Sequence, residues 1–337
     1  MLAALREAER GIGWTSPNPA VGAVIVRRGR IIGRGWHRRA GQPHAEIEAL
    51  HSLARPEQAK GATIYVTLEP CSTHGRTPPC VEAIIRAGFA RVVIGAIDPN
   101  PKHAGRGVDI LRKAGIEVAS GVMAEACTAL NAAFNKWIVT GLPWVIAKAG
   151  MSLDGRITRP PGEGQWLTSK EARADAMRLR ARADAILIGA NTLRNDDPKL
   201  TIRGLEEFRE KPQPWRVVVS RGKRPLPKAA HVFTDGQRDR TLVYRGKSLR
   251  AVLKDLGRRQ VTTVLIEGGM RVLGDAFDRG LVDEVCFYVA PLLCGGPMTA
   301  VGGKGTASTA AAPAIRDPVY TKIGDNLRLS GKVAYPG

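Results

Sequence analysis

Short apolar runs alternate with amphipathic, helix-like stretches along the whole chain, and this alternation restricts the fold more than any other feature. It is typical of α/β architectures, in which strands form a sheet and the helices between them cover its faces. In the first half we predict strands at the apolar runs 20–26, 62–68 and 91–97. We predict helices at the N-terminus and at residues 44–53 and 80–86.

A helix-stop signal divides the chain near its middle. The amphipathic stretch 123–140 runs into Gly141-Leu142-Pro143, and Gly followed closely by Pro ends a helix. A chain of 337 residues also suits two domains better than one core. We therefore predict two α/β domains, at residues 1–141 and 142–337. The second has predicted helices at 170–182 and 270–279 and strands at 143–149, 184–190, 216–220, 261–267 and 283–290.

Composition separates this chain from membrane, secreted and disordered proteins. Hydrophobic residues make up 44% and charged residues 24%, as in globular proteins. We find no apolar run long enough to span a bilayer, and the N-terminus lacks the basic-then-apolar order of a signal peptide. Five scattered cysteines indicate reduced thiols or metal ligation. We expect a cytoplasmic protein without a membrane partner.

The formal net charge of +20 would attract polyanions, so nucleic acid has to be considered as a partner. The Lys and Arg residues are spread along the sequence without a basic tail, and only 5% of the residues are aromatic. Few side chains are therefore available to stack on unpaired bases. We predict a basic surface suited to phosphorylated metabolites and no nucleic-acid partner.

Three potential zinc ligands occur in order in the first half. His44 begins a predicted helix, Cys71 follows the strand 62–68, and Cys80 comes after eight intervening residues. One His and two Cys form a three-ligand zinc site with a fourth position open for water, whose pKa the metal lowers toward neutrality. Glu46, two residues beyond His44, can carry the water proton to a leaving amine without binding the metal. The pattern predicts hydrolytic deamination.

The cysteine spacing is wider than in the usual zinc-deaminase signature, in which H-x-E is followed by P-C-x-x-C. Here the second motif reads PCSTHGRTPPC. Pro78-Pro79 stiffens the insert and Cys80 can begin the next helix, so both sulfurs can still reach one metal. The alternative is that both cysteines are buried apolar residues and His44 lies on a helix surface. Three correct residue types in order favour the metal site, with His74 lining the pocket or lying at its rim.

The second half offers weaker chemical signals. The strand 261–267 leads into Gly268-Gly269 and a helix, which is either a turn or a place where backbone N–H groups approach a phosphate. It does not match the dinucleotide fingerprint G-x-G-x-x-G. Arg180 and Arg203 carry guanidinium groups suited to phosphate, and Asp196-Asp197-Pro198 is compatible with a turn. Residue patterns alone leave nucleotide binding open.

Motifs spread over nearly the whole chain resemble one enzyme family. In the first half they are TSPNPAVGAVIV, HAEIEAL, YVTLEPCSTHGRTPPC and IDPNP, and in the second KAGMSLDGRI, QWLTSKEAR, LRARADAILIGANTLRNDDPKLTIR, IEGGMRVLGDAF and LVDEVCFYVAP. The chain closely resembles the bifunctional deaminase/reductases of riboflavin biosynthesis, in which the longer cysteine spacing is usual. The resemblance implies an N-terminal cytidine-deaminase-like α/β/α layer fold and a C-terminal dihydrofolate-reductase-like α/β fold.

The same resemblance implies two reactions on a small phosphorylated pyrimidine. The first domain would use zinc to deaminate a diaminohydroxy-phosphoribosylaminopyrimidine. The second would use NADPH to reduce the ribosyl group of the product to ribityl, by hydride delivery to the sugar carbon of the ring-opened imine. We also expect a homo-oligomer.

The resemblance further assigns binding residues. In the first site, Asn18 and His37 would contact the pyrimidine; the residues alone favour a structural or exposed position for His37 over contact with substrate. On the substrate side of the second site it implies Lys148, Arg180, Asp196, Arg203 and Glu267. On the cofactor side it implies Gly150, Trp166, Thr168, Thr192, Leu200 and the segment 269–275, including Gly269, Gly274 and Asp275.

Three positions depart from the pattern of the family. Thr73 stands where members commonly carry His, Gly164 where they carry a small hydroxyl residue, and Ser220 where they usually carry Asp. We expect that one hydrogen bond in each site is absent or made by water. A change at Ser220 could also alter a loop near the cofactor.

Two other functions compete with this interpretation. A nucleoside or nucleic-acid deaminase would use the same metal ligands, but a nucleic-acid enzyme has to admit a flipped base with its neighbours. The insert between the cysteines and a second domain without a nucleic-acid-binding motif argue against it. The other alternative is a deaminase with an inactive reductase-like domain. Oxidation of NADPH by the purified protein, given the deaminated intermediate, would distinguish an active reductase domain from an inactive one.

Overall fold

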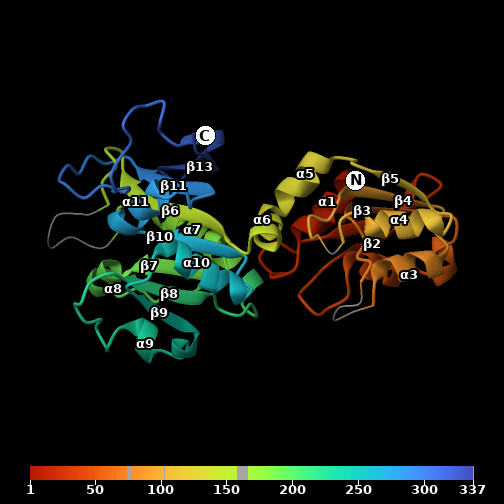
Figure 1. The fold of residues 1–337 in the computed structure, drawn as a ribbon, viewed down its shortest axis with the longest axis horizontal. Coiled ribbons are helices and arrows are strands. Elements are labelled where there is room, and N and C mark those ends of the chain that lie inside the picture. The colour runs from red at the N-terminus through yellow and green to blue at the C-terminus, as the bar shows by residue number, and fades with distance from the viewer. Residues whose placement is uncertain (74–77, 102, 158–165, 337) are drawn as a thin grey trace. The chain divides into compact units, whose positions relative to one another are not determined.

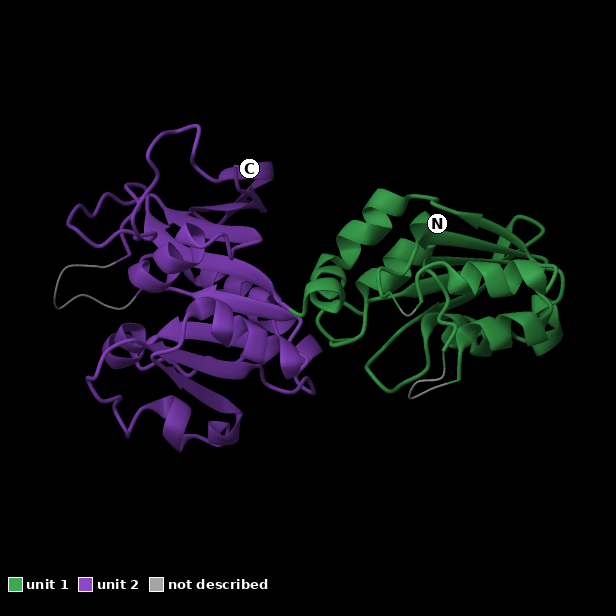
Figure 2. Ribbon diagram, in the orientation of Figure 1, with its two compact units in different colours: residues 1–141 green, residues 142–337 purple. Residues whose placement is uncertain are grey.

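The computed structural model describes residues 1–73, 78–101, 103–157 and 166–336, so His74 and Gly164 lie outside the described residues. The chain forms two compact units, Met1–Gly141 and Leu142–Gly337 (Figures 1 and 2). Gly141 ends the last helix of the first unit in the left-handed conformation, with φ of 70°. Because glycine has no Cβ, it takes this conformation without strain, and the chain leaves the helix there.

A five-stranded mixed sheet, in the order β2-β1-β3-β4-β5, forms the centre of the first unit (Figure 1). β1 pairs antiparallel with β2 and β3, whereas β3, β4 and β5 are parallel. The strands are β1 (Gly22–Arg27), β2 (Arg30–Trp36), β3 (Thr63–Leu68), β4 (Arg91–Ala96) and β5 (Glu117–Ser120). The helices are α1 (Leu2–Glu9), α2 (Ala45–His51), α3 (Cys80–Ala87), α4 (Arg106–Lys113), α5 (Ala124–Leu130) and α6 (Ala132–Thr140).

Helices cover both faces of this sheet. On one face, buried side chains of β1, β3 and β4 pack against α2, α3 and α4 in one core cluster. On the other face, α1 and α5 pack against the ends of β3 and β4. A Cβ on Gly35 would lie 2.2 Å from the backbone nitrogen of Ala49, so only glycine lets α2 approach β2 this closely. The first unit therefore has the expected α/β/α layers.

The second unit contains an eight-stranded sheet in the order β12-β13-β11-β6-β10-β7-β8-β9. From β11 to β9 neighbouring strands are parallel, and β13 and β12 add an antiparallel hairpin at one edge. The strands are β6 (Trp144–Ser152), β7 (Ala185–Gly189), β8 (Trp215–Ser220), β9 (Thr241–Arg245), β10 (Thr263–Glu267), β11 (Glu284–Ala290), β12 (Ala314–Ile323) and β13 (Asn326–Ala334). The helices are α7 (Lys170–Arg182), α8 (Ala190–Asp196), α9 (His231–Thr234), α10 (Leu249–Arg258) and α11 (Met270–Asp278).

This sheet is also covered on both faces. Helices α10 and α11 pack against β6, β7, β8 and β10 in the largest core cluster. On the other face, α7 packs against β6, β10 and β11, while α8 and α9 cover β7 and β8. Strands buried on both sides read as continuous apolar runs, which is why the sequence located β7, β8 and β10.

The structure corrects the sequence-based expectations in three kinds of place. The helices α4, α8, α9 and α10 were not predicted. The strands β2, β5, β9, β12 and β13 were not predicted, because they lie toward sheet edges and carry exposed or charged side chains. The single amphipathic stretch 123–140 is two helices that meet at Asn131. The Asn131 side chain makes two hydrogen bonds with the backbone of Ala20, which lies 111 residues away in the sequence. In the described part of the chain, no helix has the length and apolar character that a membrane span requires.

Candidate active sites in the two units

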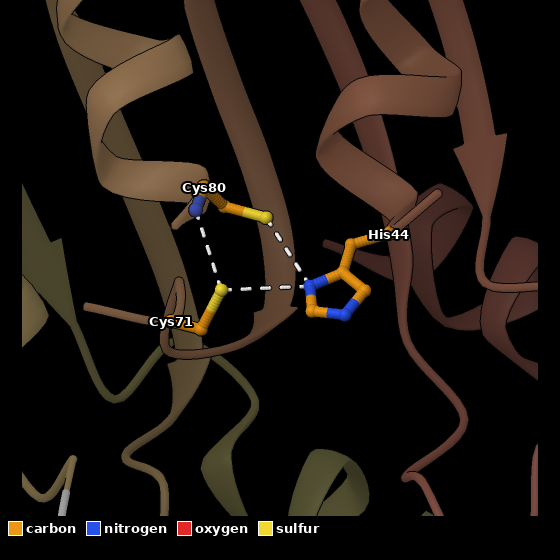
Figure 3. A group of neighbouring side chains, drawn as sticks. All are labelled: His44, Cys71 and Cys80. Atoms are coloured by element: carbon orange, nitrogen blue, oxygen red, sulfur yellow. Dashed lines mark hydrogen bonds between the residues drawn. The ribbon is translucent and has the colours of Figure 1, made fainter. Parts of the chain in front are cut away.

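His44, Cys71 and Cys80 converge at one edge of the first sheet (Figure 3). His44 caps the N-terminus of α2, Cys71 follows β3, and Cys80 is the first residue of α3. Nδ1 of His44 lies 3.5 Å from Sγ of Cys71 and 3.3 Å from Sγ of Cys80. The wider cysteine spacing therefore does not prevent both sulfurs from reaching one metal ion, because the start of α3 places Cys80 next to Cys71.

These distances fit a tetrahedral zinc ion. With Zn–S bonds of about 2.3 Å and Zn–N bonds of about 2.0–2.1 Å, a sulfur and a nitrogen on one ion lie about 3.6 Å apart. The three ligand atoms all lie within 4.8 Å of one another, and they are the only such group among the described residues. Two thiolates and an imidazole are donors that favour zinc over hard cations.

The two thiols differ in acidity. Sγ of Cys71 accepts a hydrogen bond from the backbone N–H of Cys80 at 3.3 Å. It also accepts one from the Cys80 thiol, and it lies beside His44. These contacts lower the pKa of the Cys71 thiol, because they stabilise its thiolate. The pKa of Cys80 is raised by the same pairing and by burial. Of the two thiols, Cys71 therefore forms the thiolate more readily.

Glu46 lies on the first turn of α2 and is only 3% exposed. Burial raises its pKa, although the nearby His44 opposes the shift. A buried carboxyl group with a raised pKa holds a proton more readily than an exposed one, as a group that accepts and then donates a proton requires. Its position next to the metal ligands matches the predicted proton carrier.

Asn18 and His37 form one hydrogen-bonded pair beside the metal ligands. Nε2 of His37 lies 3.0 Å from Nδ2 of Asn18, and Nδ1 of His37 lies 3.0 Å from the carbonyl oxygen of Pro43. The His37 ring meets the His44 ring edge to face, with 5.2 Å between the centroids. Burial lowers the pKa of His37, which is 2% exposed.

Sequence reasoning missed Glu69, which comes directly before Pro70-Cys71. Its buried carboxylate accepts hydrogen bonds from the backbone N–H groups of Asp98, Gly105, Gly107 and Val108. It thereby ties the segment that follows β4 to the end of β3. The available signal was an acidic residue between an apolar strand and a metal ligand. Near this segment lies Thr73, one of the positions that depart from the family pattern. Its Oγ1 lies 3.5 Å from Nε2 of His103.

In the second unit, Arg180 and Glu267 form a buried ion pair with two hydrogen bonds, of 2.6 and 2.7 Å. Lys148 stands opposite Glu267 in the β6–β10 register. Burial alone would raise the pKa of Glu267, but the charges of Arg180, Lys148 and Arg203 lower it to about 2. The structure therefore brings together four of the five residues expected on the substrate side.

Thr201 links two of these cations and was not singled out from the sequence. Its carbonyl oxygen accepts a hydrogen bond from Arg180 at 2.9 Å, and its hydroxyl accepts one from Arg203 at 3.1 Å. The fifth expected residue, Asp196, is exposed at the end of α8. Leu200 has φ of 50° and its side chain is buried in the core, so only its backbone is left to face a cofactor.

Several residues expected on the cofactor side are neighbours. Helix α11 follows Gly268 and Gly269, whose φ angles are 77° and 89°, and a Cβ on Gly269 would lie 3.1 Å from Oγ1 of Thr192. A Cβ on Gly150 would lie 3.2 Å from Cγ2 of Thr168. Because these two glycines lack a side chain, the two threonines can lie close to the backbone there.

The remaining expected residues have contacts inside the protein. The indole of Trp166 is exposed and lies 5.3 Å from the Arg173 guanidinium. Gly274 packs against the backbone of residues 302–303, and Asp275 forms ion pairs with Arg221 and Arg279. Ser220, which also departs from the family pattern, donates a hydrogen bond to the carbonyl oxygen of Gly222 at 3.4 Å.

An α/β/α unit with a His/Cys/Cys group and a buried glutamate defines a zinc deaminase fold, here followed by a second α/β unit in which three cations gather near Glu267. Comparisons with known proteins agree. Residues 1–96 match the cytidine and deoxycytidylate deaminase zinc-binding region, and residues 143–327 match the RibD C-terminal domain.

Full-length relatives show the same pairing of domains. The riboflavin biosynthesis protein RibD of Escherichia coli is 44% identical, with 88% of each chain covered. That of Aquifex aeolicus is 38% identical, with 97% of this chain and 96% of the relative covered. The Acinetobacter baumannii RibD structure superposes with a TM-score of 0.90 at 38% identity, covering 99% of this chain and 97% of that one. The Thermotoga maritima deaminase/reductase superposes with a TM-score of 0.88 at 32% identity and the same coverage.

The chain belongs to the RibD family, the bifunctional deaminase/reductases of riboflavin biosynthesis. It contains a zinc-binding deaminase domain and a reductase domain, as the resemblance of its motifs implied. The cofactors are zinc for deamination and NADPH for reduction. The enzyme processes a phosphorylated pyrimidine.

Proposed function

We propose that residues 1–141 deaminate 2,5-diamino-6-(phosphoribosylamino)pyrimidinone and that residues 142–337 reduce the ribosyl group of the product. The observation that carries the first assignment is the convergence of His44, Cys71 and Cys80 beside the buried Glu46. The substrate is the one in the name of the Thermotoga maritima relative, a diaminohydroxyphosphoribosylaminopyrimidine deaminase.

In the first site His44, Cys71 and Cys80 would hold zinc, which supplies Lewis-acid activation of a water molecule. The water oxygen adds to the amino-bearing ring carbon, and the carbon–nitrogen bond then breaks to release ammonia. Glu46 takes a proton from the attacking water and passes it to the leaving nitrogen. Asn18 contacts the substrate, and His37 belongs to the same polar group.

In the second site Arg180, Arg203 and Lys148 offer cations for the phosphorylated substrate, and Glu267 holds Arg180 in place. Asp196 completes the substrate side. The residues that would hold NADPH are those assigned to the cofactor side by the family resemblance: Gly150, Trp166, Thr168, Thr192, Leu200, Gly269, Gly274 and Asp275. Hydride transfer to the sugar carbon of the ring-opened imine, with a proton to its nitrogen, gives the ribityl amine.

One experiment separates the two activities. The purified protein is given the diamino substrate, first without and then with NADPH, and the products are followed by mass spectrometry. We expect the deaminated ribosyl compound in the first case and the ribityl compound in the second. Deamination without reduction would indicate an inactive second domain, and no deamination would contradict the proposal.

The ligand set has its own test. We expect about one zinc per purified chain, and we expect Cys71→Ser and Cys80→Ser each to lose it. Cys294→Ser is the matched control, because this half-buried free cysteine lies in the second unit. Full zinc occupancy in both ligand variants would refute the assignment.

We also propose a cytoplasmic homo-oligomer. None of the five cysteines forms a disulfide, as a reducing compartment favours. The edge hairpin β12–β13 exposes Val319, Tyr320 and Leu327, at 54%, 64% and 42% of their surfaces. An edge strand with exposed apolar side chains is a site for association with a second copy. Light scattering should give a multiple of 36.2 kDa, and Tyr320→Glu should lower it.

A further inference from the structure

The segment that follows β11, residues 291–304, crosses the carboxyl ends of three neighbouring strands, and we call it the crossing segment. In the second sheet β6 lies between β11 and β10, and all three strands are parallel. After β11 the crossing segment meets the turn that follows β6, where the N–H of Leu153 donates to the carbonyl of Leu292 at 2.8 Å. It then reaches α11, which follows β10, and the N–H of Gly302 donates to the carbonyl of Met270 at 3.0 Å.

Ligands of open α/β sheets bind at the carboxyl ends of the parallel strands. Several residues of the proposed second site lie at this edge: Lys148 and Gly150 are on β6, and Gly269 follows β10. The crossing segment packs directly on α11, because a Cβ on Gly274 would lie 2.3 Å from the carbonyl carbon of Gly302. The segment therefore runs along the same edge as the residues expected on the cofactor side.

Asp154 joins the turn after β6 to the start of the crossing segment. Its Oδ1 accepts a hydrogen bond from the N–H of Cys294 at 3.1 Å, and its Oδ2 accepts one from the N–H of Gly295 at 2.7 Å. The hydroxyl of the fully buried Ser152 donates to Oδ1 as well. The Ser152 hydroxyl and the two N–H groups hold the pKa of Asp154 well below its ordinary value, because all three stabilise the carboxylate. Hydrogen bonds to an ionised acceptor are the stronger kind.

The rest of the crossing segment is held between this turn and α11. The N–H of Ala300 donates to the carbonyl of Gly155 at 2.9 Å, and the side chain of Ala300 is buried in the largest core cluster. The N–H of Lys304 donates to Oδ2 of Asp278 on α11 at 2.9 Å. Residues 295–298 are exposed, so burial contributes little to ordering them. Two carboxylates, of Asp154 and Asp278, therefore hold the two ends of the segment.

We propose that the crossing segment is part of the cofactor side and that Asp154 is the positioning residue that holds it there for NADPH binding. This inference rests on the proposed function of residues 142–337. Asp154 acts through the crossing segment and does not have to touch the cofactor. Loss of its two hydrogen bonds to the segment should weaken the binding of NADPH more than the binding of the phosphorylated substrate.

Amide hydrogen exchange in the full-length protein tests the first step without cofactor. In Asp154→Asn the amide hydrogens of Cys294 and Gly295 should exchange about tenfold faster or more, because asparagine has one acceptor oxygen in place of two and turns an NH₂ group toward a backbone N–H. Asp239→Asn is the matched control, because the Asp239 side chain is 95% exposed. Exchange at the parental rate in Asp154→Asn would overturn the proposal.

Equilibrium binding of NADPH to the zinc-loaded full-length protein tests the second step. We expect Asp154→Asn to raise the Kd for NADPH by about tenfold, while KM for the deaminated substrate stays within about threefold of the parent. Asp239→Asn should change neither value. A purely structural role of Asp154 would speed amide exchange but leave the Kd for NADPH at the parental value, and this outcome would contradict the proposal.

A double-variant cycle identifies the path of the effect. Asp278→Ala releases the other end of the crossing segment from an exposed position of α11, and it should itself raise the Kd for NADPH by about threefold or more. Once it has done so, Asp154→Asn should raise the Kd by no more than about twofold further. An unchanged Kd in Asp278→Ala, or a full additional rise in the double variant, would show that the segment does not carry the effect.

The same measurements separate this inference from the proposed function. A parent protein that binds NADPH but does not reduce the deaminated substrate would contradict the proposed reduction. The Kd values of the variants would still decide the role of Asp154.

Discussion

Glu46 shows how one residue obtains its chemistry from its surroundings. A glutamate on a helix surface is ionised at neutral pH and exchanges protons with the solvent. Here the side chain is 3% exposed, and burial raises its pKa, with His44, Cys71 and Cys80 among its neighbours. Burial therefore favours the protonated form of this carboxyl, which suits a group that delivers a proton to a leaving amine.

We predict that Glu46→Gln keeps zinc and the fold but loses deamination by about a hundredfold or more, because the amide cannot carry the proton. Reduction of substrate that is already deaminated should be unchanged. The matched control is Glu48→Gln on the same helix, where the carboxylate pairs with Arg38. Deamination by Glu46→Gln at the parental rate would place the proton carrier elsewhere.

Glu267 predicts a pH dependence of stability. Its folded pKa of about 2 is below the ordinary value of 4.5, so its ionised form stabilises the fold above pH 4.5. This contribution is lost as the pH falls through the folded pKa. Glu267→Gln should therefore be less stable than the parent at neutral pH, and the difference should narrow as the pH falls toward about 3.

Urea unfolding of the second unit at several pH values measures this difference. Asp239→Asn is a suitable control, because the Asp239 side chain is 95% exposed and pairs only loosely with Arg238, at 4.0 Å. A difference between Glu267→Gln and the parent that stays constant with pH would show that the ion pair is not its source.

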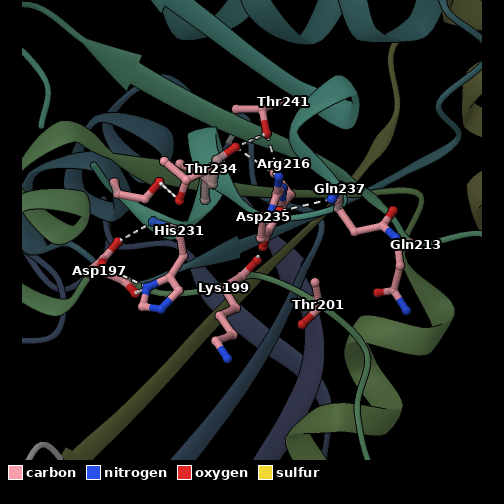
Figure 4. A network of polar contacts seen from close by, with 12 residues as sticks. Asp197, Lys199, Thr201, Gln213, Arg216, His231, Thr234, Asp235, Gln237 and Thr241 are labelled. Carbon is pink, nitrogen blue, oxygen red and sulfur yellow. Dashed lines mark hydrogen bonds and ion pairs between the residues drawn. The ribbon is translucent and has the colours of Figure 1, made fainter. Parts of the chain in front are cut away.

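At the scale of elements, Arg216 on β8 joins four parts of the second unit (Figure 4). Its guanidinium is buried and donates to the carbonyls of Lys199 and Val232, the carboxylate of Asp235 and the hydroxyl of Thr241. Lys199 precedes β8, and Val232 lies on α9. Asp235 follows α9, and Thr241 begins β9. The segment around Lys199 continues to Thr201, which contacts Arg180 and Arg203.

We predict that Arg216→Met destabilises the second unit by about 3 kcal/mol, because buried acceptors lose their donor. Reduction should weaken, since the segment that bears Thr201 is less firmly held. Arg245→Met on the neighbouring strand β9, where the side chain is exposed, is the matched control. Equal thermal unfolding of the two variants would contradict the role of this network.

At the scale of the whole molecule, each unit has its own sheet and core. We therefore predict that residues 1–141 alone fold and bind zinc, and that residues 142–337 alone bind NADPH. In the intact chain, Asp196→Asn should impair reduction while zinc content and deamination stay at the parental level. Equal losses of both activities in Asp196→Asn would contradict a model with two separate sites.

The sequence by itself determined the α/β class, most buried strands and the group His44, Cys71 and Cys80. These follow from local properties: apolar runs mark strands, and one His with two Cys in order has few uses other than zinc. The resemblance of longer motifs identified the family, which the relatives confirm.

Only the tertiary structure decided which polar groups meet. The pairing of Arg180 with Glu267, the four backbone partners of Glu69 and the contact between Asn18 and His37 join residues that are 19 to 87 positions apart. The hairpin β12–β13 and the helix break at Asn131 likewise depend on partners that cannot be identified from the local sequence. Hydrophobic periodicity and donor type belong to each segment, whereas the choice of hydrogen-bond partners depends on strand order and helix packing, which exist only in the folded chain.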